Sequence, residues 1–249
     1  MERNELIAHA SLAAREAGDF IRLSLKEYGV ALDGRDIKTT LDTGAGALIE
    51  KRLAHTHLPV ISEETFTPGK IPEVYWLIDP LDGTANVVSG FGPYTVSIAL
   101  IRNGRAELGF ILDIKADRLW WTGEKGVYID GERFVATPKP ASSGILFTGV
   151  PLRGSYPWDH LDMGKFSKVR MIGCASMSIL NVASGKGGTY FEDGIFFWDV
   201  AAALAIAERL GCSIELSIPD DNLRMKVFVT SSAAPSLPTD VDLTAIESV

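Results

Sequence analysis

The chain has 249 residues, with 24 Lys and Arg against 32 Asp and Glu, which gives a net charge of −8. Apolar residues make up 46% of the chain and charged residues 22%, which excludes a disordered chain, a collagen-like repeat and a disulfide scaffold. The acidic balance argues against a surface for nucleic acid or anionic membranes, because both need clustered Lys and Arg. We therefore expect neither partner, and an anionic substrate would need a bound metal to supply positive charge.

The two cysteines, Cys174 and Cys212, lie far apart with no CxxC spacing, which favours free thiols in a reducing cytosol over a disulfide. The first residues carry charges throughout and lack the apolar run of a signal peptide. No apolar stretch is long enough for a membrane-spanning helix. We expect a cytoplasmic protein.

The first segment of the chain has the residue spacing of a helix. Apolar residues recur at intervals of three and four from Ile7 to Leu25, which predicts an amphipathic helix that stops near Gly29. The short polar stretch 30–40 is expected to form a loop. A second helix is expected over residues 45–53, although glycines weaken its start.

From Leu58 onward, short β-rich runs alternate with turn residues, which predicts an α+β domain with a mixed or antiparallel sheet. Asn103-Gly104 and Asp130-Gly131 have the composition of two-residue hairpin turns. The expected strands are LPVIS, VYWLID, YTVSIALI, AELGFILDI, RLWWTGE and GVYID.

A Pro- and Ser-rich segment, residues 137–143, predicts a linker between two domains. We expect an N-terminal α+β domain over residues 1–136 and a C-terminal α/β domain over 137–249. The last dozen residues are expected to be a loosely held tail. In the second domain, helices are expected over Met177–Ala183 and Val200–Leu210.

Two carboxylates three residues apart follow an apolar strand. Asp79 and Asp82 belong to DPLDGT, in which Pro80 stiffens the backbone and Gly83 permits a tight turn. Such a turn offers a hard divalent cation two carboxylates and the carbonyl of Leu81. An ordinary Asp-rich turn has the same composition, so this segment alone leaves both interpretations open.

Acidic residues also stand at three other strand or helix ends. Glu63-Glu64 follows an expected strand, Asp42 precedes the second helix, and Asp199 opens a late helix. Taken singly, the glutamates fit a solvated loop, and the two aspartates fit helix capping. Together with DPLDGT, they form the pattern of a carboxylate cage for Mg²⁺.

The segments ISEE, WLIDPLDGTAN, GVYIDGERF, IGCAS and FFWDVAAALAIAERLG resemble, in this order, the motifs of the inositol monophosphatase family. These are magnesium-dependent, lithium-sensitive phosphatases. The resemblance extends from the first helix to about Gly211. It implies an α/β fold, the αβαβα sandwich of that family, with the active site between two domains and a homodimer as the assembly.

The resemblance implies that two or three Mg²⁺ ions bind. Glu63, Asp79 and the Leu81 carbonyl would hold one ion, with Glu64 supporting them. Asp79 would also contribute to a second ion, together with Asp82 and Asp199.

The resemblance further implies that Asp42 and Thr84 orient and deprotonate an attacking water, with Glu63 counted among the catalytic residues. A larger group would contact the substrate, its phosphate or its alcohol portion: Asp82, Gly83, Thr84, Gly173, Ala175 and Glu192.

The implied reaction is hydrolysis of a small phosphate monoester, and inositol monophosphate is the favoured substrate. A 3′(2′),5′-bisphosphate nucleotidase and a histidinol-phosphate phosphatase are alternatives within the family. A non-catalytic, partner-binding protein is the alternative from another class. Val87 and Gly188 stand where the family usually carries an aromatic and an acidic residue, so they bear on which substrate fits.

Overall fold

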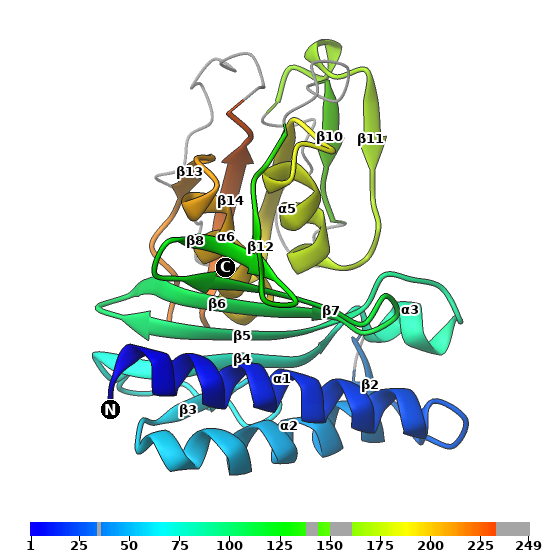
Figure 1. The fold of residues 1–249 in the computed structure, drawn as a ribbon. Helices are drawn as coiled ribbons and strands as arrows, with labels where there is room; N and C mark the ends of the chain where they lie inside the picture. Colours follow the sequence, from blue (N-terminus) through cyan, green and yellow to red (C-terminus); the bar gives the residue numbers. More distant parts are fainter. Residues whose placement is uncertain (34–35, 138–143, 150–160, 233–249) are drawn as a thin grey trace.

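The computed structural model describes residues 1–33, 36–137, 144–149 and 161–232. Within this part, a seven-stranded and a five-stranded sheet dominate, and a two-stranded hairpin stands apart from them. Helices α1 and α2 cover one face of the larger sheet, and α5 and α6 lie between the two sheets (Figure 1). The layers therefore run helices, sheet, helices, sheet, and the predicted layered α/β fold is confirmed.

The helices are α1 (Arg3–Ser24), α2 (Thr40–Leu53), α3 (Thr84–Val88), α5 (Ala175–Ala183) and α6 (Phe197–Arg209), with short 3-10 helices at Ala54–Thr56 and Met163–Lys165. The larger sheet, in the order β3-β4-β5-β6-β7-β8-β9, comprises Val60–Ser62, Val74–Asp82, Thr95–Arg102, Arg105–Asp113, Arg118–Gly123, Gly126–Ile129 and Glu132–Phe134. The smaller sheet has the order β11-β10-β12-β14-β13. Its strands are β10 (Ile145–Phe147), β11 (Lys168–Arg170), β12 (Thr189–Phe196), β13 (Ser213–Leu216) and β14 (Arg224–Thr230).

The prediction of a loop over residues 30–40 is wrong. Strands β1 (Val30–Asp33) and β2 (Asp36–Thr39) pair antiparallel as a hairpin. Helix α2 starts directly after it, five residues earlier than predicted, because Thr39 and Asp42 form a reciprocal capping box at its first turn. Gly44 and Gly46 fit within the helix, since a Cβ on Gly44 would lie 2.4 Å from the ring of Phe20.

The predicted strands of the larger sheet are confirmed, with β9 as an addition. Asn103-Gly104 and Asp130-Gly131 have positive φ at both positions, as expected for two-residue hairpin turns. The first DPLDGT residues form no turn, however. β4 continues to Asp82, with a register shift against β5 between Asp79 and Asp82. A bulge of this kind re-aims the side chains at a strand end.

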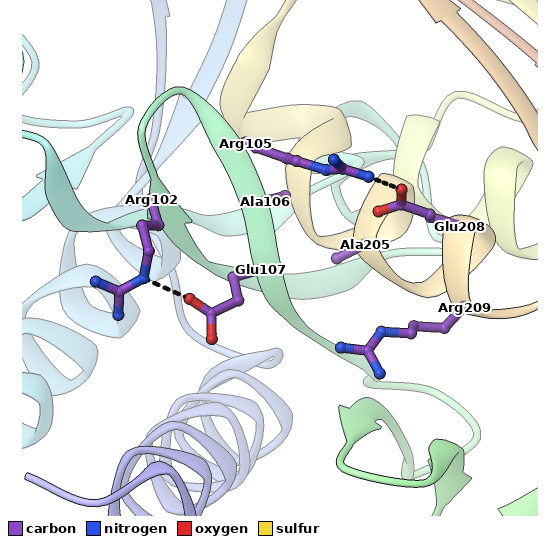
Figure 2. Close-up of a pocket in the computed structure, with 7 residues that line it drawn as sticks. All are labelled: Arg102, Arg105, Ala106, Glu107, Ala205, Glu208 and Arg209. Carbon is purple, nitrogen blue, oxygen red and sulfur yellow. Dashed lines mark hydrogen bonds and ion pairs between the residues drawn. The ribbon is translucent and has the colours of Figure 1, made fainter.

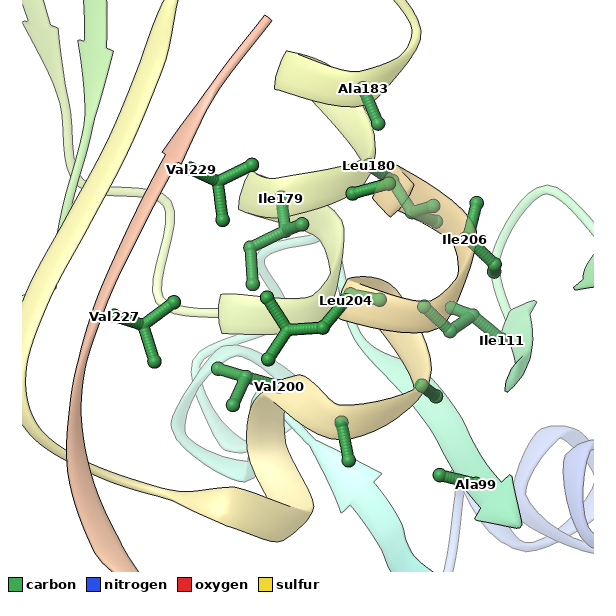
Figure 3. Close-up of a cluster of buried hydrophobic side chains, with 14 of the residues drawn as sticks. Ala99, Ile111, Ile179, Leu180, Ala183, Val200, Leu204, Ile206, Val227 and Val229 are labelled. Atoms are coloured by element: carbon green, nitrogen blue, oxygen red, sulfur yellow. The ribbon is translucent and has the colours of Figure 1, made fainter. Parts of the chain in front are cut away.

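Helices α5 and α6 fill the space between the sheets with apolar side chains (Figure 3). Leu180 and Leu204 pack in one cluster with Ile111 from the larger sheet and Val227 from the smaller one. This cluster draws on both predicted domains, while the predicted linker from residue 138 onward and the C-terminal tail lie outside the described residues. The domain boundary stays a prediction. No helix in the described ranges combines the length and apolarity that a membrane span requires.

Candidate metal centre and active site

Three carboxylates from three elements converge at one end of the larger sheet. Glu63 follows β3, Asp79 lies in β4, and Asp199 lies in the first turn of α6. Each offers an oxygen, and these oxygens all lie within 4.8 Å of one another. The parallel pairing of β3 with β4 sets Glu63 beside Asp79, and the Glu63 N–H donates to the Ile78 carbonyl at 3.1 Å.

The electrostatics of this cluster favour a cation. Burial raises the pKa of Asp79 well above its usual range, and the charges of Glu63, Asp82 and Asp199 raise it further. The pKa of Asp199 is raised in the same way, by burial first and then by Glu63 and its other acidic neighbours. Oxygen ligands of this kind suit Mg²⁺, so the residues present fit the ion that the family resemblance implies.

Lys38 is a basic residue at the edge of the cluster. Its Nζ donates to Glu63 Oε1 at 3.0 Å and to Glu64 Oε1 at 2.7 Å. Burial alone would lower the pKa of Lys38, but the charges and hydrogen bonds of both glutamates outweigh it and raise the pKa. Lys38 was not expected at the site, because residues 30–40 were predicted to form a loop. Glu64 pairs with Lys38 and is not one of the three converging carboxylates.

Asp82 is also outside the three-carboxylate cluster, although its charge raises the pKa of Asp79 and Asp199. Its carboxylate is tied to the start of α5, where the Ala175 N–H donates to Oδ1 at 3.2 Å and the Ser176 N–H donates to Oδ2 at 2.8 Å. The backbone of Ala175, expected to meet the substrate, therefore contacts Asp82. Ser176 was not anticipated from the sequence.

Asp42 and Thr84 contact each other directly. Thr84 Oγ1 donates to Asp42 Oδ1 at 2.8 Å, while Asp42 Oδ2 accepts from the N–H and hydroxyl of Thr39. Thr84 Oγ1 also lies 3.0 Å from the Leu81 carbonyl. The N-cap residue of α2 is Thr39 and Asp42 is the third helical residue, so the capping and water-orienting interpretations of Asp42 are compatible.

Gly83 and Gly173 allow two segments to approach closely. Gly83 has φ +94° at the start of α3, and a Cβ there would lie 3.0 Å from the Pro93 carbonyl oxygen. A Cβ on Gly173, at φ +66°, would lie 2.9 Å from Asn86 Oδ1. The Asn86 amide donates to the Pro93 and Ile172 carbonyls at 2.7 and 2.8 Å, which holds the Gly173 segment against DPLDGT.

Glu192 lies in β12 of the smaller sheet, with its carboxylate towards the aspartates. Burial raises its pKa to about 7, with a further contribution from the charge of Asp82. The Tyr190 hydroxyl donates to Glu192 Oε2 at 2.8 Å, and the Gly149 N–H also donates to the carboxylate. A polar oxygen is thus held near the carboxylate cluster on the side of the second sheet.

A separate pocket of about 440 Å³ contains none of these residues (Figure 2). Arg102 pairs with Glu107 there, and Arg105 pairs with Glu208. Arg102 ends the strand that begins at Thr95 opposite Asp82, so the pocket is roughly 20 Å from the carboxylates at a strand rise of about 3.3 Å per residue. It is distinct from the candidate centre.

Comparison with known proteins shows the family of this chain. The sequence model of the inositol monophosphatase family matches residues 2–230. Nus factor SuhB of Pseudomonas aeruginosa is 31% identical over 219 residues, covering 80% of each chain. Inositol monophosphatase 1 of Sus scrofa is 27% identical over 92% of this chain and 91% of its own.

The fold is similar to that of solved structures. The crystal structure of the extragenic suppressor protein suhB from Bartonella henselae superposes with a TM-score of 0.79 at 22% identity, covering 92% of this chain and 95% of that one. The chain belongs to the inositol monophosphatase family, a family of phosphatases.

Proposed function

We propose that this protein is a Mg²⁺-dependent phosphomonoesterase that hydrolyses a small phosphate monoester, with inositol monophosphate as the favoured substrate. The observation that carries the proposal is the convergence of Glu63, Asp79 and Asp199 from three separate elements. Asp79 is buried, whereas Glu63 and Asp199 are half-buried. Holding three carboxylates this close together is costly without a cation, as the raised pKa values of Asp79 and Asp199 indicate. Lys38 supplies one positive charge to Glu63, and a bound metal would supply positive charge to Asp79 and Asp199 as well.

The metal ligands would be those that the family resemblance implies. Glu63, Asp79 and the Leu81 carbonyl would hold one Mg²⁺, and Asp79, Asp82 and Asp199 would hold a second. Bound magnesium would supply positive charge for the phosphate and the leaving oxygen. This positive charge would offset the repulsion between an anionic substrate and a chain with a net charge of −8.

Asp42 and Thr84 would position and deprotonate the attacking water. Their hydrogen bond supports this role, because a carboxylate that accepts from Thr84 can orient the hydroxyl towards a water and take up its proton. Gly83 and Thr84 would direct backbone N–H groups at the phosphate from the start of α3. Glu192, with Gly173 nearby, would contact the alcohol portion of the substrate.

A panel of substrates tests the proposal. Phosphate release would be measured from myo-inositol 1-phosphate, adenosine 3′,5′-bisphosphate, histidinol phosphate and fructose 1,6-bisphosphate, with Mg²⁺ and with a chelator. We expect the inositol phosphate to be the best substrate, with no release after chelation and inhibition by lithium. Better turnover of adenosine 3′,5′-bisphosphate would favour the nucleotidase alternative. Better turnover of histidinol phosphate would favour the histidinol-phosphate phosphatase.

The partner-binding alternative makes a different prediction for the same panel. The P. aeruginosa relative is named a Nus factor, which keeps a binding role as the second candidate for this chain. A purely binding protein would release no phosphate from any substrate while remaining folded. A homodimer, which the family resemblance also implies, would be checked on the same preparation by light scattering.

A further inference from the structure

A set of buried hydroxyl and thiol groups surrounds one oxygen of Asp82. Asp82 Oδ2 accepts from Ser176 Oγ at 2.6 Å, from the Ser176 N–H at 2.8 Å and from Cys174 Sγ at 3.2 Å. Among the residues that the structure describes, Asp82 Oδ1 has a single contact of this kind, the Ala175 N–H at 3.2 Å. The two oxygens of one carboxylate are therefore very differently occupied.

The hydrogen-bond directions follow from chemistry. An ionised carboxylate only accepts, so the single hydroxyl hydrogen of Ser176 is donated to Asp82. Thr95 Oγ1, which lies 2.7 Å from Ser176 Oγ, must then donate to Ser176. Thr95 and Ser176 are both fully buried, so no solvent competes for these bonds. The result is a directed chain from Thr95 through Ser176 to Asp82.

The geometry points to Ser176 as a positioning residue: its hydroxyl, oriented by Thr95, holds the Asp82 carboxylate so that Oδ2 is committed to α5 and Oδ1 is the oxygen left for a cation. A carboxylate oxygen has room for about two acceptor interactions, and three donors already surround Oδ2. Asp82 would then hold the metal through Oδ1 alone. This inference rests on the proposed function, since it needs a metal at Asp82.

Ser176 also connects the two halves of the site. Asp82 ends a strand of the larger sheet, whereas Ser176 lies in α5, which packs against the smaller sheet. Hydrogen-bonding partners of metal ligands typically contribute about 10–100-fold to metal affinity or activity. Here the contribution would come from a segment more than 90 positions away in the chain, since Asp82 and Ser176 are 94 apart.

Direct metal binding is the test. Mn²⁺, a paramagnetic substitute for Mg²⁺, is titrated into the whole protein and followed by electron paramagnetic resonance. We expect Ser176→Ala to weaken Mn²⁺ binding by about 10–100-fold. The Mg²⁺ concentration needed for half-maximal activity should rise in parallel, with kcat largely recovered at saturating Mg²⁺. Wild-type or tighter Mn²⁺ binding by Ser176→Ala would overturn the assignment.

Ser178→Ala is the matched control. Ser178 is another buried hydroxyl of α5, but it donates to the Cys174 carbonyl at 2.8 Å and has no bond to Asp82. Its variant should bind Mn²⁺ like wild type. An equal loss in both serine variants would reduce the effect to packing in α5 and overturn the positioning role.

Two further variants keep the test decisive. If Ser176→Ala does not fold, Thr95→Val breaks the chain one step earlier, and Thr95→Ser should restore it. Thr95→Val should weaken Mn²⁺ binding, and unchanged binding would overturn the role of the hydrogen-bond chain from Thr95 to Asp82. The proposed function fails separately, because wild-type protein would then show neither Mn²⁺ binding nor phosphate release.

Discussion

The hydroxyl of Thr84 donates a hydrogen bond to Asp42 Oδ1 at 2.8 Å, which joins the start of α3 to the first turn of α2. The other carboxylate oxygen of Asp42 is held by Thr39, so the side chain is fixed at both ends. A carboxylate held in this way can orient Thr84 without belonging to the three-carboxylate cluster. In the proposed mechanism, this arrangement would separate the activation of water from the binding of metal.

Asp42→Asn should therefore depress kcat by about 10²–10⁴-fold while leaving Mg²⁺ affinity nearly unchanged. Steady-state kinetics over a range of Mg²⁺ concentrations separate the two effects. Thr39→Ala is the control for capping. It should cost about 1 kcal/mol of stability with kcat largely retained, because the Thr39 N–H still donates to Asp42 Oδ2. A large loss of Mg²⁺ affinity with normal kcat at saturation would assign Asp42 to the metal cage instead.

Asp79→Asn should lower the phosphatase activity by orders of magnitude. It should also stabilise the metal-free protein at neutral pH. Folding raises the pKa of Asp79, so the native state holds more protons than the unfolded state above the usual value of 3.8. The metal-free protein must then lose stability as pH rises from about 3.8 through the raised pKa. Asparagine carries no charge and removes this loss.

Denaturant unfolding at several pH values, with a chelator present, measures this effect. Asp113→Asn, which removes a carboxylate that is not one of the three converging ones, provides the control and should not stabilise the metal-free protein as Asp79→Asn does. An Asp79→Asn protein that is less stable than wild type at pH 7.5 without metal would contradict the prediction.

Lys38→Met should destabilise the metal-free protein by about 1–2 kcal/mol, because Glu63 and Glu64 lose the cation that they contact. Added Mg²⁺ should recover most of this loss by neutralising the same side of the cluster. Thermal unfolding with and without Mg²⁺ tests both parts. Lys51→Met, at an exposed lysine of α2, should change neither value, and a Mg²⁺-independent loss in Lys38→Met would refute the electrostatic explanation.

Glu192→Gln should lower kcat/KM for the favoured polyol phosphate by about 1.5–3 kcal/mol, the contribution of a hydrogen bond to a charged group. Hydrolysis of a simple aryl phosphate should change little, because that substrate has no hydroxyl for Glu192 to recognise. Equal losses on both substrates would indicate damaged metal geometry rather than lost recognition.

The pH dependence adds a second test of Glu192. Its pKa of about 7 in the protein means that the ionised acceptor forms as pH rises through that value. The kcat/KM for the polyol phosphate should rise over this range, relative to the aryl phosphate measured in parallel. Glu192→Gln should remove the difference between the two profiles, and a difference that persists would exclude Glu192 as its source.

Local sequence patterns determined several elements of the fold and the family of this protein. Helix α1 follows from apolar residues spaced by three and four, and the hairpin turns follow from Asn103-Gly104 and Asp130-Gly131. The DPLDGT segment and its acidic companions also identified the family before any contact was known. Each of these features lies within a short segment of the sequence, so it can be recognised before the contacts between segments are known.

Only the tertiary structure decided which of these residues meet. The β1–β2 hairpin lacks a strong apolar alternation, so neither its strands nor the contact of Lys38 with Glu63 was predicted. β4 continues to Asp82 because the sheet supplies partners for its backbone. The Ser176–Asp82 bond joins positions 94 apart. Contacts of this kind arise from how the sheets and helices pack, and no local period in the sequence encodes them.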